Sequence, residues 1–325
     1  MSTGTVLPAP TAPPTRTKAV ESSATWRPLD RLGLALCWIL GVGFCVITAA
    51  IVLYLLVQGL RYVTPELVFT RPTAGFTEAQ TGGFLDPLLG TLLVTTMGMA
   101  IALPVGIGIA IWLSEYGRPA ALARIADSTI ETIAGAPSVV LALFGTLIFT
   151  SPALGFLSRT SDGVVYGRSF FGAAAMLSFV ALPLIVTSTR EGLAAIPAHV
   201  REASYAVGKT KIATTRRILL PTARPSVITG AMLGAGRIVG DTAIIVLLLG
   251  ATLQFNGSGD IPLLNTLKGT GSTLTSYVYQ NSPTGEGNNP TKAYAAAFVL
   301  LLIVLVLNLG VELVNRRSKA TTWAL

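Results

Sequence analysis

Apolar residues gather into six long runs, and the segments between the runs hold most of the charged side chains. A membrane-spanning helix needs about 20 consecutive, mostly apolar residues. The pattern therefore predicts an all-α integral membrane protein with six transmembrane helices. The third run is the least regular, because Gly135 and Pro137 lie near its start. The six predicted spans are Leu32–Val57, Leu88–Leu113, Ile130–Phe149, Phe171–Thr189, Val227–Ala251 and Ala293–Val314.

Composition and charge agree with this prediction and orient the chain. The 325 residues are 51% hydrophobic and 12% charged, whereas a soluble domain carries about 25% charged residues. The N-terminal segment, the second and fourth loops and the C-terminal segment hold 16 of the 23 Lys and Arg residues, and the other three loops hold 6. Positive loops stay on the cytoplasmic side. Both termini are therefore expected in the cytoplasm, and the net charge of +8 reflects topology rather than nucleic-acid binding.

The ends of the chain and its few reactive side chains add little chemistry. Residues 1–27 are rich in Pro, Thr, Ser and Ala without apolar periodicity, which predicts a disordered cytoplasmic tail rather than a cleaved signal peptide. Cys37 and Cys45 lie within the first apolar run, so we expect buried packing rather than a disulfide or a metal site. The predicted organisation is a first helix with an extracytoplasmic loop at 28–85, a transmembrane domain at 86–315, and a cytoplasmic tail at 316–325.

The most basic segment lies between the fourth and fifth apolar runs. A helix should begin after Pro197, break at Gly208 and resume until Pro221. One interpretation is a solvated connector that is basic only because it faces the cytoplasm. The other is a docking element that inserts apolar side chains, ringed by cations, into a cleft of a peripheral protein. The expected apolar anchors are Tyr205, Val207, Ile212, Ile218 and Leu219, and the expected ring is Lys209, Lys211, Arg216 and Arg217.

Part of this segment imitates a nucleotide-binding loop. Gly208, Lys209 and Thr210 match the end of a phosphate-binding P-loop. The first glycine of that motif is replaced by Ala203, and no strand leads into the segment. We therefore expect no ATP binding here, no cofactor and no catalytic residue in this chain.

The same segment resembles a known family. Glu202-Ala203-Ser204, Gly208 four residues later and Ile218-Leu219-Leu220-Pro221 are similar to the EAA loop of type I ABC importer permeases, with Ser204 in place of the second alanine. In that family the loop docks on an ATPase subunit and transmits its closure to the membrane helices. The resemblance implies the type I ABC importer permease fold, with a coupling loop at 191–224. The coupling residues it implies are Glu202, Ala203, Gly208, Leu220 and Pro221.

The fifth run contains two charged residues inside the membrane. Arg237 follows Pro225 by twelve residues, about 18 Å along a helix and so near the middle of the bilayer. Such a charge is costly and marks a transport pathway by default. One interpretation is that Arg237 and Asp241 only neutralise each other during assembly. The other is an anion pathway, in which the planar guanidinium of Arg237 binds a tetrahedral oxyanion and Asp241 holds that side chain between passages.

The neighbourhood of Arg237 resembles phosphate-specific (Pst-type) ABC permeases. The family's Arg-x-x-Gly-Glu-Thr-Ala stretch is similar to the segment from Arg237 to Ala243, with Asp241 replacing the usual Glu, and this implies Arg237, Asp241 and Thr242 as pathway residues. Further similar stretches lie at 82–92, 134–138 and 182–183. The stretch from Ile261 to Lys292 and the apolar end with Asn308 favour the A-type subunit over the C-type, although Thr187 and Arg190 resemble the C-type.

The resemblance implies the permease subunit of a phosphate importer in the bacterial plasma membrane. Its implied partners are a homologous permease subunit, two copies of a cytoplasmic ATPase, an extracytoplasmic phosphate-binding protein and membrane lipid. The chain would not be an enzyme, although the complex consumes ATP. Two alternatives stay open: a permease for another oxyanion such as sulfate or molybdate, and a membrane scaffold or sensor of phosphate supply that transports nothing.

Overall fold

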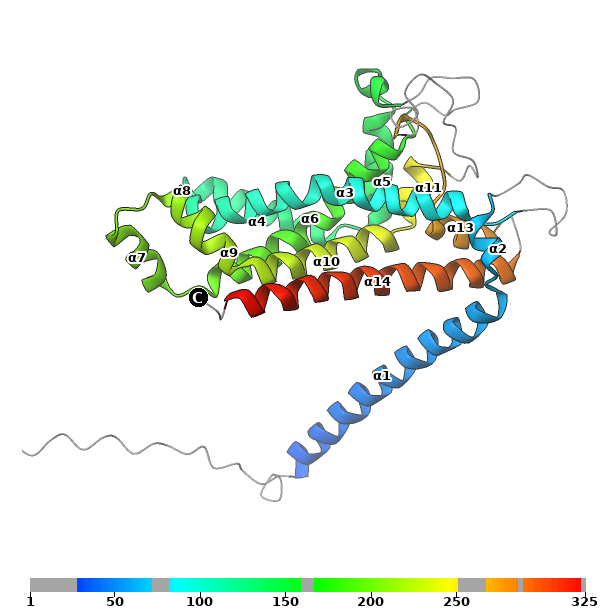
Figure 1. Ribbon diagram of the computed structural model, residues 1–325, viewed down its shortest axis with the longest axis horizontal. Helices are drawn as coiled ribbons and strands as arrows, with labels where there is room; N and C mark the ends of the chain where they lie inside the picture. The colour runs from blue at the N-terminus through cyan, green and yellow to red at the C-terminus, as the bar shows by residue number, and fades with distance from the viewer. Residues whose placement is uncertain are drawn as a thin grey trace, which may run out of the picture. The chain divides into compact units, whose positions relative to one another are not determined.

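The computed structural model describes residues 28–71, 82–158, 167–250, 267–283, 285 and 289–322. These ranges are predominantly helical and contain no strand, which confirms the predicted all-α class. The predicted tail at 1–27 and much of the predicted fifth loop lie outside the described residues. In chain order the elements are α1 (Pro28–Tyr62), α2 (Pro65–Phe69), α3 (Leu85–Ile111), the π-helical turn η3 (Trp112–Tyr116), α4 (Ala120–Gly135), α5 (Ser138–Phe149), the 3-10 turn η4 (Pro152–Leu157), α6 (Phe170–Ala194), α7 (Ala198–Ala206), α8 (Lys211–Thr214), the π-helical turn η5 (Thr215–Leu219), α9 (Leu220–Thr222), α10 (Arg224–Gly240), α11 (Ala243–Leu248), α13 (Leu274–Asn281) and α14 (Pro290–Thr322) (Figure 1).

Four helices within the described residues are long and apolar enough to cross a membrane. They are α1, α3 continued through η3, α6, and the Pro290–Gly310 part of α14, and they match the first, second, fourth and sixth predicted spans. The third predicted span corresponds to α4 and α5 together, which bend by 108° where Ala136 and Pro137 separate them. The described residues therefore support up to five of the six predicted spans. A helix was not expected inside the predicted fifth loop, yet α13 lies there with Leu274 and Tyr277 buried.

The prediction of one continuous helix over Val227–Ala251 is wrong. Helix α10 ends at Gly240, Asp241 has the extended backbone angles φ −80° and ψ 117°, and α11 begins at Ala243. The Asp241 carboxylate accepts a hydrogen bond from the backbone N–H of Ile244 at 3.1 Å. This is the bond that an aspartate makes at a helix N-terminus, and it competes with continuation of the preceding helix.

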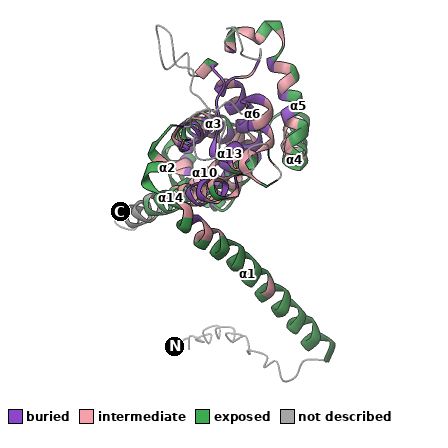
Figure 2. Ribbon diagram, turned by 90° about the vertical axis from the view of Figure 1, so that its right-hand side faces the viewer, coloured by how far each residue is buried: buried purple, intermediate pink, exposed green. Residues whose placement is uncertain are grey.

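The core around the site consists of α3, α6 and α10, which pack against one another (Figure 2). Small residues permit the close approach. A Cβ atom added to Gly230 would lie 3.1 Å from the Cα atom of Ile185, and one added to Gly234 would lie 3.2 Å from the Ile185 side chain. The predicted role of Gly230 and Gly234 in helix packing is therefore confirmed, and the neighbouring helix is α6.

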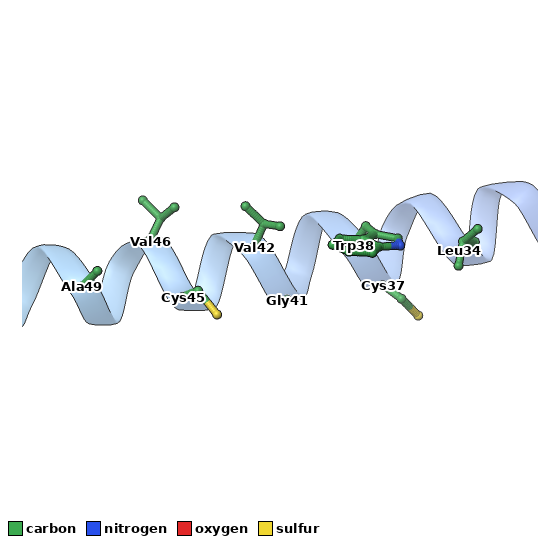
Figure 3. Close-up of a pocket in the computed structure, with 8 residues that line it drawn as sticks. All are labelled: Leu34, Cys37, Trp38, Gly41, Val42, Cys45, Val46 and Ala49. Atoms are coloured by element: carbon green, nitrogen blue, oxygen red, sulfur yellow. The ribbon is translucent and has the colours of Figure 1, made fainter.

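The N-terminal part of α1 belongs to a separate compact unit that ends at Tyr54, and we describe it by itself. Its apolar side chains are exposed on all faces. Figure 3 shows a shallow groove from Leu34 to Ala49, and every residue that lines it comes from this one helix. The groove is therefore the surface of a bare helix rather than a cavity. Cys37 and Cys45 are exposed there, so the prediction that they are buried is wrong for this unit.

Candidate functional site

The predicted break in the basic segment is present, and glycine is required at its turn. Helix α7 begins after Pro197 and ends at Ala206, and Gly208 has a φ of +75°. The Gly208 N–H donates to the carbonyl of Tyr205 at 2.9 Å, and the Lys209 N–H donates to the carbonyl of Ser204 at 3.2 Å. A side chain at Gly208 would meet nothing within 4 Å, so the backbone angle rather than space selects glycine. We call residues 198–222, which form α7, the turn, α8, η5 and α9, the basic loop.

The prediction that Pro221 ends the second helix of this loop is wrong. Pro221 lies in the first turn of α9. Proline is tolerated at this position of a helix, because the first turn does not require its N–H. The chain then passes through Ala223 alone before α10 begins. The basic loop therefore leads almost without interruption into the helix that carries Arg237.

The basic loop exposes both apolar side chains and cations. Tyr205, Val207 and Ile212 are 42%, 73% and 70% exposed. The cations Lys209, Lys211, Arg216 and Arg217 are also exposed, as are Glu202, Ala203, Gly208 and Pro221. Leu220 is half-buried. We call Tyr205, Val207 and Ile212 with Lys209, Arg216 and Arg217 the outer face, whereas the Lys211 ammonium contacts η3, as described below.

One expected anchor belongs to the inner face instead. Leu219 is fully buried and clusters with Leu193, Ile196 and Ala223, so its prediction as a docking residue is wrong. It lies in the π-helical turn η5, which directs Leu219 toward the end of α6. Leu219 therefore holds the loop on the membrane domain rather than offering it to a partner.

The two arms of the basic loop are joined by a buried hydroxyl pair. The hydroxyls of Ser204 in α7 and Thr214 in α8 lie 2.8 Å apart, and Ser204 is 4% exposed. An alanine at this position could not form the hydrogen bond, so Ser204 helps to hold α7 against α8. Ala203 is part of helix α7 rather than of a phosphate-binding turn, which agrees with the prediction that this segment is not a P-loop.

Sequence reasoning missed Arg201 and Glu115, which form the most extensively bonded ion pair near the loop. The guanidinium of Arg201 donates from Nε and from one terminal nitrogen to Glu115 Oε1, at 3.1 and 2.9 Å. It also donates to the backbone carbonyls of Leu193 and Ile196, at 2.9 and 2.8 Å. The Glu115 side chain is 6% exposed and that of Arg201 is 23% exposed. Arg201 thus ties α7 to the end of α6 and to η3.

A second contact joins the loop to the same turn of η3. The Lys211 ammonium, in α8, lies 4.8 Å from the centroid of the Tyr116 ring. A cation within about 6 Å of an aromatic face is attracted to it. Glu115 and Tyr116 are adjacent, so both arms of the basic loop contact one π-helical turn.

Arg237 lies in α10 with its side chain exposed. Within the described part of the chain no ion pair or hydrogen bond engages its guanidinium. Asp241 is 5% exposed and uses its carboxylate to cap α11, as described above. The predicted holding of Arg237 by Asp241 is therefore absent from this structure, because the chain leaves the helix before Asp241. A Cβ atom at Gly236 or Gly240 would meet nothing within 4 Å, so this side of α10 is open.

Thr242 lines a groove of about 570 Å³ beside the break in the fifth run. Residues of α5, α11, α13 and α14 meet there. Its lining is apolar except for Thr242, Thr275 and the Tyr279 hydroxyl, and the Thr275 hydroxyl donates to the carbonyl of Val239 at 3.3 Å. The remaining lining residues are Val139, Ala243, Val246, Leu247, Val278 and Leu300.

The predicted site residues thus form two groups at opposite ends of α10 (Figure 1). The coupling residues lie before its start, beside α7 and α8. Asp241 and Thr242 lie just past its end, and Arg237 lies one turn earlier. Helix α10 is the element that links the two groups.

Comparison with known proteins gives the chain's relatives. A family described as "Binding-protein-dependent transport system inner membrane component" matches residues 102–320. The phosphate transport system permease protein PstA 1 of Mycobacterium tuberculosis is 30% identical over 234 residues, which cover 72% of this chain and 71% of that protein. The permease protein PstC of Xylella fastidiosa is 28% identical over 240 residues and 69% of each chain.

Solved structures show the same fold. A bacterial alginate ABC transporter, in complex with a periplasmic protein that holds an alginate pentasaccharide, contains a chain with a TM-score of 0.61 and 16% identity, over 89% of this chain and 95% of that one. A chain of the inward-facing MetNI methionine ABC transporter has a TM-score of 0.53 and 21% identity, over 73% and 94%. The chain therefore belongs to the inner-membrane permease family of binding-protein-dependent ABC transport systems.

Proposed function

We propose that this chain is a permease subunit of an ATP-driven importer of inorganic phosphate in a bacterial plasma membrane. The observation that carries the proposal is Arg237, an exposed guanidinium without a described partner in the last turn of α10, within the fifth run predicted to span the membrane. An unpaired charge is expensive in a membrane and is retained where a ligand compensates it. The phosphate permeases among the relatives support phosphate as that ligand.

Arg237 provides the landing place for the anion in this proposal. Its planar fork of donors matches two oxygens of a tetrahedral anion. Because the Asp241 carboxylate caps α11, it leaves the guanidinium open in the state described here. Asp241 shapes the break in the chain, and the Thr242 hydroxyl offers a polar group beside it.

The basic loop couples the chain to a cytoplasmic ATPase. Three exposed apolar side chains inside a ring of cations are what a cleft of a partner protein with acidic edges would bind. Glu202, Ala203 and Gly208 lie on this accessible side, and Leu220 and Pro221 connect it to α10. The chain itself hydrolyses nothing, and closure of two ATPase copies moves the loop.

The remaining partners complete the importer. A homologous permease covers the open side of α10, and an extracytoplasmic binding protein delivers phosphate. We assign the A-type role to this chain, with both termini in the cytoplasm. Relatives of both the A-type and the C-type match at similar identity, so the assignment rests on the sequence features of residues 261–308.

The test is ATP hydrolysis by the reconstituted complex. The chain is co-expressed with a candidate C-type permease and ATPase, purified, placed in proteoliposomes and supplied with the binding protein. Phosphate should stimulate hydrolysis and should enter the vesicles. Stimulation by sulfate or molybdate in place of phosphate would reassign the substrate. Phosphate binding without any uptake, in a complex that contains the ATPase, would favour a sensor.

A further inference from the structure

The π-helical turn η3 is contacted by both arms of the basic loop. Arg201 of α7 reaches Glu115, and Lys211 of α8 reaches the neighbouring Tyr116. The two arms are themselves joined by the Ser204–Thr214 hydroxyl pair. A displacement of the loop cannot leave η3 behind without breaking contacts at two points. This arrangement is separate from the direct chain connection between the loop and α10.

The Arg201 contact is the stronger of the two. All three guanidinium nitrogens donate, and the acceptors come from two different elements. Leu193 lies in the last turn of α6 and Ile196 lies two residues past its end, so both carbonyl acceptors mark the C-terminal end of that helix. Because Glu115 is almost fully buried, loss of either charge would leave the other uncompensated.

A second arginine–carboxylate ion pair, which does not involve the basic loop, serves for comparison. Arg190 of α6 pairs with Asp127 of α4, and one of its two bonds measures 3.2 Å. Its side chains are 35% and 39% exposed, and neither lies in the basic loop. The Arg190 pair joins α6 to α4, whereas the Arg201 pair joins the basic loop to η3 at the end of α3.

The position of η3 gives the contact a mechanical consequence. The turn continues α3 without interruption, and its π-type bond runs from the Gly117 N–H to the Trp112 carbonyl at 2.7 Å. Single π-helical turns inside α-helices occur frequently at functional sites. Helix α3 packs along α6 and α10 through most of the core. A push on η3 therefore reaches the core through α3, in addition to the chain connection from the loop to α10.

We propose that η3 receives the movement of the basic loop and passes it to α3, with Arg201 as the positioning residue that joins them and Tyr116 as a second, weaker contact. This proposal rests on the proposed coupling to an ATPase. The loop then drives two membrane helices together: α10 through the chain and α3 through the Arg201–Glu115 pair. With the pair broken, the ATPase closes on the loop and only α10 follows.

The first experiment measures phosphate imported per ATP hydrolysed in the reconstituted complex. Arg201→Lys keeps the charge but loses the planar fork that reaches three acceptors. It should lower this ratio about tenfold, within the usual range of energetic coupling between sites. ATPase binding and ATP hydrolysis should remain. Arg124→Lys is the matched control, because Arg124 is exposed on α4 and its described bond is to Ala120 of its own helix.

Tyr116 supplies a pair of variants that do not depend on the buried ion pair. Tyr116→Phe keeps a ring beneath Lys211 and should leave the ratio unchanged. Tyr116→Leu removes the ring and should lower the ratio roughly two- to fivefold, as expected for one exposed cation–π contact. Equal ratios for Phe and Leu would remove Tyr116 from the proposal. An unchanged ratio for Arg201→Lys, or a loss explained by failure of the ATPase to bind, would overturn the proposal.

The second experiment observes the movement directly. Spin labels are placed at exposed Ala206 in the loop and exposed Val105 in α3, after Cys37 and Cys45 are replaced by serine. If loop and α3 move as one body, ATP binding leaves the distance between the labels unchanged in the parent and shifts or broadens it in Arg201→Lys. A clear ATP-dependent shift in the parent would overturn the proposal. If the parent complex imports another oxyanion, only the substrate assignment fails, and the same ratio is measured with that anion.

Discussion

Arg201 and Arg237 present the same guanidinium group in opposite surroundings. Arg201 donates four hydrogen bonds, to one carboxylate and two backbone carbonyls, and its side chain is 23% exposed. Arg237 is exposed, and no described group engages it. A satisfied arginine fixes elements relative to one another, whereas an unsatisfied one is available to a ligand. The difference separates a structural end of the molecule from a binding end, with α10 between them.

The largest expected effect tests which side chains hold the loop in place. Leu219→Ala should lower the free energy of unfolding by about 2–5 kcal/mol, because it empties a fully buried position. Ile212→Ala, at an exposed position, should change it by no more than about 0.5 kcal/mol but weaken ATPase binding. Thermal unfolding of the detergent-purified complex and pull-down of the ATPase measure the two effects. Equal destabilisation by both variants would contradict the division into inner and outer faces.

The next effect tests the binding end. Arg237→Gln should reduce phosphate uptake roughly 10- to 150-fold, because hydrogen bonds to a charged group contribute about 1.5–3 kcal/mol. The thermal unfolding temperature should not fall, since no described contact is lost. Arg124→Gln on α4 is the control for loss of one exposed arginine. Normal transport by Arg237→Gln would remove the anion pathway from this helix face.

A smaller effect is expected at the turn of the basic loop. Gly208→Ala should cost about 1–2 kcal/mol locally, since a φ of +75° disfavours any side chain. Gly108 in α3 also has open space around it but lies within a helix. Gly108→Ala should therefore gain about 0.5–1 kcal/mol. Uptake should fall for Gly208→Ala and not for Gly108→Ala, and the reverse order would show that the turn geometry does not matter.

The smallest effect distinguishes two roles of Asp241. Asparagine caps a helix about as well as aspartate, so Asp241→Asn should change stability by only a few tenths of a kcal/mol. Asp241→Ala should cost about 0.5–2 kcal/mol, because the bond to the Ile244 N–H is lost. If transport fails in Asp241→Asn while the fold is intact, the carboxylate charge itself is needed, and the comparison between the two arginines must include a transient Arg237–Asp241 pair.

Local patterns predicted most of the basic loop. Pro197, the break at Gly208 and the exposed apolar residues Tyr205, Val207 and Ile212 all follow from residue types that act over a few positions. Leu219 was predicted on the wrong face, because a π-helical turn shifts the helical register that spacing assumes. The Glu115–Arg201 pair had no local signal, since 86 positions separate its members.

The broken fifth run shows a different limit. Its composition is apolar on both sides of Asp241, so a count of apolar residues reads it as one span. The sequence does carry the signal for the break: an aspartate followed by an apolar run is typical of a helix N-terminus. The length of the apolar run predicts one continuous span, whereas Asp241 predicts a new helix start. The structure follows the second prediction, with the Asp241 carboxylate bonded to the Ile244 N–H.

The near-continuous run from Lys211 to Gly240 also makes chain length a functional quantity. Helical elements α8, η5, α9 and α10 follow one another with only Ala223 between them outside a helix. In a helix each residue turns the direction of its side chains by about 100°. The number of residues from Ile212 to Arg237 therefore sets the angle between the docking face and the anion-facing side of α10. An insertion or deletion of one residue there would leave both groups chemically intact and aim them in different directions.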